Sequence, residues 1–200
     1  MRTVAHTSSA GFSLLELLVV LALLVILTVM STGRFSSSAR RTELAHCQGN
    51  LQKIYLALSL YRNDNGVLPV LKDAPDPAAA LSLLIPKSTT VTEIFICPGS
   101  RDQALPEGES FAHRRISYAY YMGRGSNDDP GEVLFSDWQV NNAPKRAGQQ
   151  IFSFDGKKPG NNHHSDGGNL VSCGGAVSGS GPKAARDLLF PSSVRLLNPQ

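Results

Sequence analysis

Residues 12–33 read FSLLELLVVLALLVILTVMSTG, and Glu16 is the only charged side chain in this stretch. As an α-helix that rises about 1.5 Å per residue, the stretch extends roughly 30 Å, which is the thickness of a bilayer's hydrocarbon core. We therefore expect a single-pass membrane helix over residues 12–33. The alternative is a cleaved secretory signal, but the apolar part of such a signal has about 7–15 residues and lacks acidic side chains.

Much of the hydrophobicity of the whole chain is concentrated in residues 12–33, and the remainder of the chain is therefore polar. The chain has 200 residues and a net charge of +3, from 19 Lys plus Arg against 16 Asp plus Glu. The charges are scattered singly or in pairs, so the sequence predicts no nucleic-acid partner. The length fits one domain, or one domain with an appendage.

The acidic residue at the start of the apolar stretch needs a partner, since a carboxylate in a bilayer costs about 2.5–3.5 kcal/mol on insertion scales. Residues 11–16 read GFSLLE. This segment resembles the N-terminus of type IV prepilins and type II secretion pseudopilins, whose short leader ends in Gly before an apolar helix. The resemblance implies that prepilin peptidase cuts after Gly11, removing residues 1–11, and methylates Phe12. It also implies that Glu16 pairs with the new amino terminus of a neighbouring subunit. One departure is Ala10, where these leaders usually carry Lys or Arg.

The orientation of the helix rests on the resemblance. It implies a protein of the bacterial inner membrane, with the head outside the cytoplasm and finally in an extracytoplasmic filament. The positive-inside count favours the opposite orientation, because Arg2 precedes the span whereas Arg34, Arg40 and Arg41 follow it.

Apolar residues continue beyond the span at spacings of three and four. They are Leu44, Cys47, Leu51, Ile54, Leu58 and Tyr61. This spacing predicts a helix with one apolar face, and the Asn65-Gly66 pair that follows favours a helix stop. We expect one continuous helix from about Phe12 to about Asn63, in which residues 34–66 form an amphipathic stalk.

The rest of the chain is expected to form a globular α+β head over residues 67–178. Asp76 followed by Pro77 predicts the start of a short helix. Five β-prone runs are separated by turn residues: Glu93 to Cys97, Ile116 to Met122, Glu132 to Trp138, Gln150 to Phe154 and Asn169 to Val177. They favour a small antiparallel sheet packed against the stalk helix. Residues 179–200 are expected to form a loose C-terminal tail.

Three cysteines allow one disulfide and one remaining thiol. Cys47 lies on the apolar face of the stalk and Cys97 ends an apolar run. We expect a Cys47–Cys97 disulfide that fastens the sheet to the stalk. Two buried free thiols are the alternative, and the sequence leaves both open.

A pair of histidines, His163 and His164, is the most conspicuous chemical cluster. It lacks a third ligand at regular spacing, so we predict no metal site. The stalk sequence and this segment resemble pseudopilin-like proteins that carry an H-x9-DG segment near the C-terminus. By that resemblance His164 is the histidine, and Gly174-Gly175 stands where Asp-Gly is expected. Both dipeptides suit a two-residue hairpin turn, which indicates a structural role.

The sequence contains none of the common catalytic motifs, so we predict no enzymatic activity and no cofactor. The expected function is that of a structural subunit of a type IV pilus-like or type II secretion pseudopilus filament. Its expected partners are prepilin peptidase, other pilin or pseudopilin subunits and the inner membrane. The alternative is an uncleaved, membrane-anchored extracytoplasmic ligand-binding protein. A metal-dependent surface enzyme is a third possibility, and it would require His163 or His164.

Overall fold

The computed structural model describes residues 12–125 and 127–199, and only the backbone of residues 31–37. The chain divides into two compact units, Met1–Ala39 and Arg40–Gln200, which are considered separately. The leader, with Gly11, lies outside the described residues. The second unit is called the head below.

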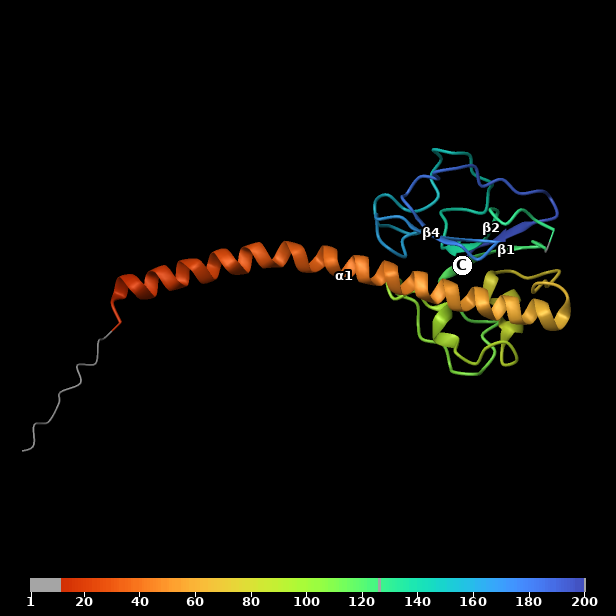
Figure 1. The fold of residues 1–200 in the computed structure, drawn as a ribbon, viewed down its shortest axis with the longest axis horizontal. Coiled ribbons are helices and arrows are strands. Elements are labelled where there is room, and N and C mark those ends of the chain that lie inside the picture. The colour runs from red at the N-terminus through yellow and green to blue at the C-terminus, as the bar shows by residue number, and fades with distance from the viewer. Residues whose placement is uncertain (1–11, 126, 200) are drawn as a thin grey trace, which may run out of the picture. The chain divides into compact units, whose positions relative to one another are not determined.

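Helix α1 spans Leu14–Asn65 and contributes residues to both units (Figure 1). Ser13 caps its first turn, because the Glu16 N–H lies 3.4 Å from the Ser13 hydroxyl oxygen. At the other end Gly66 has a φ of 75°, and its N–H donates to the Arg62 carbonyl at 2.8 Å. A left-handed glycine just beyond the last turn is a common helix stop. The expected helix is confirmed.

Among the described residues, no helix is both long enough and apolar enough to cross a membrane. The single-pass span over residues 12–33 therefore stays a prediction.

The head contains one five-stranded antiparallel sheet. Its strands are β1 (Tyr118–Met122), β2 (Val133–Asp137), β3 (Gly168–Ser172), β4 (Val177–Ser180) and β5 (Arg195–Leu197). Their spatial order is β4-β3-β2-β1-β5. A helix packed against a small antiparallel sheet is the expected α+β, pilin-like class of fold.

The C-terminal part of α1 lies along one face of this sheet, between the sheet and the segment of residues 67–117 (Figure 1). Its inner face is fully buried at Leu51, Ile54 and Leu58, and these side chains share one core with residues of β1 and β2. The predicted spacing of three and four thus marks the face that packs. Each fully buried Leu or Ile contributes about 1.5–3 kcal/mol of transfer free energy.

Loops cover the opposite face of the sheet. Ile151, Phe152 and Leu188 pack there against Tyr121 of β1 and form a second apolar cluster. The ring of Phe190 meets the Tyr121 ring edge-on at a centroid distance of 5.4 Å. Both faces are therefore covered, and all five residues of β1, β2 and β3 are buried.

Helix α2 (Pro77–Leu81) confirms the predicted short helix. The Asp76 carboxylate accepts a hydrogen bond from the Ala79 N–H at 3.0 Å, and Pro77 occupies the first turn. A 3-10 turn, η1 (Ser82–Leu84), follows directly.

Two of the predicted strands are wrong. The run from Glu93 to Cys97 contains the 3-10 helix η2 (Thr92–Phe95), and the Ile96 N–H donates to the Glu93 carbonyl rather than to a neighbouring strand. Its apolar side chains are buried by turning inward, which is an alternative to strand pairing. The run from Gln150 to Phe154 forms only one isolated bridge, between Gln150 and Lys183.

The expectation of a loose tail over residues 179–200 is also wrong. Strand β5 pairs with β1, with Leu196 opposite Tyr121 and Leu197 opposite Tyr120. Alternation places Leu196 in the second cluster and Leu197 in the core shared with α1. The C-terminal segment therefore completes the sheet and belongs to the head.

Candidate functional site

The N-terminal end of α1 presents the residues that the sequence assigned to processing and assembly. Phe12 is 78% exposed just before the helix, and Glu16 is an exposed acid in its first turn. A carboxylate at this position interacts favourably with the helix dipole. No ion pair involves Glu16 among the described residues, so its carboxylate is accessible to an outside cation.

The first turns of α1 also carry a continuous apolar surface. Its large apolar residues are Phe12, Leu14, Leu15, Leu17, Leu18, Val19, Val20, Leu21, Leu23, Leu24, Val25, Ile26, Leu27, Val29 and Met30. Their exposed fractions run from 44% at Val20 to 82% at Leu14. An exposed apolar surface of this extent marks contact with lipid or with other protein chains.

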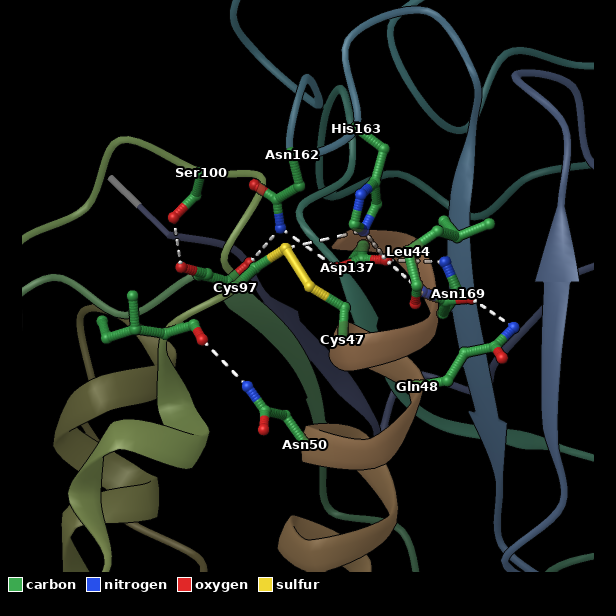
Figure 2. The surroundings of a disulfide bond; sticks show 12 residues. Leu44, Cys47, Gln48, Asn50, Cys97, Ser100, Asp137, Asn162, His163 and Asn169 are labelled. Atoms are coloured by element: carbon green, nitrogen blue, oxygen red, sulfur yellow. Dashed lines mark hydrogen bonds and ion pairs between the residues drawn. A yellow bond between two sulfur atoms is a disulfide. The ribbon is translucent and has the colours of Figure 1, made fainter. Parts of the chain in front are cut away.

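A second feature lies inside the head, where a disulfide joins Cys47 of α1 to Cys97 after η2 (Figure 2). The two Cα atoms are 5.3 Å apart, and both residues are fully buried. This is the pairing that the sequence offered as one of two alternatives. It links α1 to the segment that carries η2, and not to the sheet as expected, because Cys97 lies outside every strand.

The disulfide lies against a buried histidine and a buried carboxylate. His163 Nε2 is 3.5 Å from Cys97 Sγ and 3.2 Å from Asp137 Oδ2, and Figure 2 shows the three side chains converging. The side chain of His163 is 2% exposed and that of Asp137 is fully buried. The ligand-type atoms of these three residues and of Cys47 all lie within 4.8 Å of one another.

Hydrogen bonds hold the Asp137 carboxylate in place at the end of β2. Oδ2 accepts from the Asn169 backbone N–H at 2.7 Å and from Asn169 Nδ2 at 3.0 Å, while Oδ1 accepts from Asn162 Nδ2 at 3.1 Å. A buried carboxylate needs such donors, because an unpaired one would be expelled or protonated. The same charge acts on Tyr118 of β1: burial first, and then the nearby Asp137, raise the pKa of its hydroxyl well above the ordinary value.

The two asparagines extend the network to other elements. Asn162 Nδ2 also donates to the Ser117 carbonyl at 2.7 Å, next to β1. Asn169 Oδ1 accepts from Gln48 Nε2 at 3.0 Å, which connects β3 to α1. The cluster therefore ties together the helix, strands β2 and β3, the residue before β1 and the loop before β3.

Backbone geometry explains how the histidine reaches the disulfide. A Cβ on Gly99 would lie 2.3 Å from the Asn162 carbonyl oxygen and 3.0 Å from His163 Nδ1, so only glycine permits this approach. His164 has a φ of 54°, in the left-handed region, and its side chain is exposed. Of the two adjacent histidines, His163 is therefore the one that points inward.

The predicted hairpin around Gly174 and Gly175 is present, but its loop has three residues rather than two. Ser172 pairs with Ala176 across the loop, through the Ser172 N–H and the Ala176 carbonyl at 3.0 Å. Gly175 has a φ of 84°, which fits a turn that ends in a left-handed residue. A Cβ there would lie 2.5 Å from the Tyr55 ring of α1, so the glycine allows the hairpin to pack on the stalk.

The sequence did not single out Asp137, Asn162 or Asn169, and it considered His163 only as half of a pair without a third ligand. One signal was available: Asp137 ends the run Val133–Asp137, whose other members are apolar or small, and a charge there needs a buried partner. The partners come from segments distant in sequence, so spacing alone could not assemble the cluster.

Residues 6–32 match the family model described as the prokaryotic N-terminal methylation motif. The match includes Gly11, Phe12 and Glu16. Comparisons with curated proteins and with solved structures returned no match. The chain thus carries the N-terminal motif of a type IV pilin-like prepilin, the class of substrate that prepilin peptidase processes.

Proposed function

We propose that the chain is a structural subunit of a type IV pilus-like or type II secretion pseudopilus filament. In this proposal it is held in the bacterial inner membrane and cut by prepilin peptidase before it assembles. The observation that carries the proposal is the methylation motif at residues 6–32 at the start of the long helix α1.

The chemistry of the first turn supports assembly. Cleavage after Gly11 would create an ammonium group on Phe12, and the accessible carboxylate of Glu16 on another copy is a suitable partner. Both charges are costly in an apolar environment when alone, so their pairing between subunits favours the assembled state. The exposed apolar residues up to Met30 would then pack against lipid before assembly and against other copies afterwards.

The head has a different role in this proposal. Its sheet, disulfide and hydrogen-bonded Asp137 cluster build a rigid body on the stalk, and we assign it no catalytic activity. It faces outward from the filament, where its surface determines contacts with other pilin or pseudopilin subunits.

Intact-mass and N-terminal peptide analysis of the protein from native membranes tests processing. We expect a chain that begins at N-methylated Phe12. A chain that begins at Met1 would contradict the proposal and would favour an uncleaved, membrane-anchored ligand-binding protein.

Co-purification of a tagged and an untagged copy tests assembly. Glu16→Ala is expected to abolish co-purification, because the ammonium group of the neighbour loses its partner. Asp64→Ala is the matched control, since it removes an exposed carboxylate from the other end of the same helix. If Glu16→Ala subunits still co-purify at the wild-type level, the pairing role is wrong.

A further inference from the structure

Four buried side chains with metal-binding atoms meet at the disulfide. Cys47 comes from α1, Cys97 from the segment after η2, Asp137 from the end of β2 and His163 from the loop before β3. Two sulfurs, one imidazole nitrogen and one carboxylate oxygen form a donor set that suits Zn²⁺ in a four-coordinate site.

The distances between these atoms fit a tetrahedral ion. With Zn–S bonds of about 2.3 Å and Zn–N and Zn–O bonds of about 2.0–2.2 Å, a tetrahedron separates N from S by about 3.5 Å and N from O by about 3.4 Å. The observed separations from His163 Nε2 are 3.5 Å to Cys97 Sγ and 3.2 Å to Asp137 Oδ2. The sulfur pair must open to about 3.8 Å in the same tetrahedron, and the other pairs of ligand atoms lie within 4.8 Å of one another.

We propose that the thiol form of the chain binds one Zn²⁺ ion through Cys47, Cys97, His163 and Asp137. The thiols exist in the newly made chain before the disulfide forms, so zinc binding and oxidation compete for the same pair of sulfurs. Closing the disulfide transfers two electrons and two protons from the thiols to an external oxidant, such as the disulfide of a thiol oxidoreductase, whereas zinc binding releases the two protons without electron transfer.

The surroundings of the cluster prepare it for an ion. Asn169 and Asn162 already orient the carboxylate of Asp137, as outer hydrogen bonds do for metal-binding carboxylates. The ion would lie between His163 Nε2 and Asp137 Oδ2, which are 3.2 Å apart, and the ring proton would then reside on Nδ1. That atom is buried and has no hydrogen-bond partner among the described residues, so a proton there carries a desolvation cost that zinc binding must exceed.

Burial sets when the ion enters. All four residues are buried, so zinc must be captured as the head folds rather than by diffusion into the folded protein. A captured ion would fasten α1 to the sheet and to the segment after η2, as the disulfide does on one side. In the reduced head, the zinc ion would therefore link α1 to the segment after η2 in place of the disulfide.

The test uses the full chain in detergent, unfolded and reduced with a phosphine, then refolded without oxygen in the presence of Co²⁺. Co²⁺ replaces Zn²⁺ in such sites and reports its ligands by absorption. We expect one equivalent of Co²⁺ with a thiolate charge-transfer band and tetrahedral d–d bands, and displacement of Co²⁺ by Zn²⁺. Protein refolded with the disulfide closed is expected to show neither band.

Substitutions identify the ligands. His163→Gln should weaken binding by about tenfold or more, because even the loss of an outer-shell partner typically costs 10–100-fold. His164→Gln is the matched control, since it changes the adjacent, exposed histidine, and it should bind as the wild type does. Cys97→Ser should lose at least half of the charge-transfer band, since only Cys47 then supplies a thiolate, whereas Cys173→Ser, at the free thiol, should retain the whole band.

Folding of His163→Gln is verified first in the disulfide-bonded form, by its melting temperature, so that lost binding is not confused with an unfolded head. The proposal is overturned if the reduced wild type binds no Co²⁺. It is also overturned if the folded His163→Gln variant binds as tightly as the wild type, or if His164→Gln weakens binding equally.

Discussion

The two halves of α1 have opposite relations to solvent, although they belong to one helix. From Leu14 to Met30 every side chain is exposed, and most of them are large and apolar. From Cys47 to Leu58 the apolar residues on one face are buried in the head, whereas Leu56, on another face, is 62% exposed.

This difference shows where each half obtains its packing partner. A helix with apolar residues at spacings of three and four packs along one face, and here the sheet and the segment of residues 67–117 supply that contact. A helix that is apolar all round requires a partner on every side. The second half of α1 thus packs against its own chain, whereas the first half presents an apolar surface suited to lipid or other protein chains.

Leu21→Arg should disrupt the contacts of the apolar first half of α1 without affecting the packing of its second half in the head. An arginine in the middle of an apolar helix costs about 2.5–3.5 kcal/mol on insertion scales, and every subunit in an assembly carries it. This cost corresponds to about a 100-fold loss of membrane association, and we expect co-purification between subunits to fall at least as far. The melting temperature of the head should not change.

Leu21→Ile serves as the control, because it keeps the apolar surface and should behave as the wild type in both assays. A head that melts earlier in the Leu21→Arg protein would show that the two halves of the helix are not independent.

Loss of the disulfide should be the largest single change within the head. The bond links residues 50 apart in sequence, and the chain-entropy relation gives a stabilisation of about 4 kcal/mol for such a loop. Cys97→Ser should lower the free energy of unfolding by this amount in chelator-treated buffer, measured by urea titration. Cys173→Ser should change it little, since Cys173 is a free thiol. Equal losses from both substitutions would contradict a stabilising Cys47–Cys97 bond.

Leu51→Ala and Leu56→Ala should distinguish the buried face of the stalk from its exposed face. The side chain of Leu51 is fully buried, so truncation should lower the unfolding free energy by about 3 kcal/mol, within the usual range for buried leucines. Leu56→Ala, five residues further along the same helix, should stay within about 0.5 kcal/mol of the wild type. Neither change should alter processing at Phe12, as read from the mass of the mature chain. A similar loss from both substitutions would contradict the one-sided packing.

The stalk helix could be predicted because the residues that determine it are close together in the sequence. Spacings of three and four identify the face that includes Leu51 and Leu58, and Gly66 directly follows the last residue of the helix, Asn65. The β-prone run from Glu93 to Cys97 misled for the opposite reason. Its apolar side chains are buried as expected, but a 3-10 turn buries them equally well, and only the surrounding chain decides between the two.

The buried cluster could be predicted only in part. Cys47 and Cys97 could be paired from their apolar surroundings, but nothing in the sequence favours His163 over His164. The choice depends on the left-handed backbone at His164 and on the close approach of Gly99, which are properties of the folded chain. Asp137 joins the cluster through contacts across 26 residues of sequence to His163, beyond the reach of spacing rules.

Alkaline pH should destabilise the head through its buried tyrosines. Burial raises the pKa of Tyr121 to about 12 from 10.0, although a hydrogen bond from Gln139 lowers it in part. The folded protein therefore keeps a proton that the unfolded chain loses, so the associated stability is complete below pH 10 and disappears as the pH rises through about 12.

At about pH 11 the difference between the folded and unfolded pKa values of Tyr121 has lowered the free energy of unfolding by about 1 kcal/mol. We expect the drop in unfolding free energy between about pH 8 and about pH 11 to be smaller by this amount in Tyr121→Phe than in the wild type. Tyr118 and Tyr120, whose pKa values are also raised by burial, contribute equally to both proteins and cancel in the comparison. Identical drops in the two proteins would mean that Tyr121 ionises as readily in the folded head as in the unfolded chain, and that the loops covering this face of the sheet admit water.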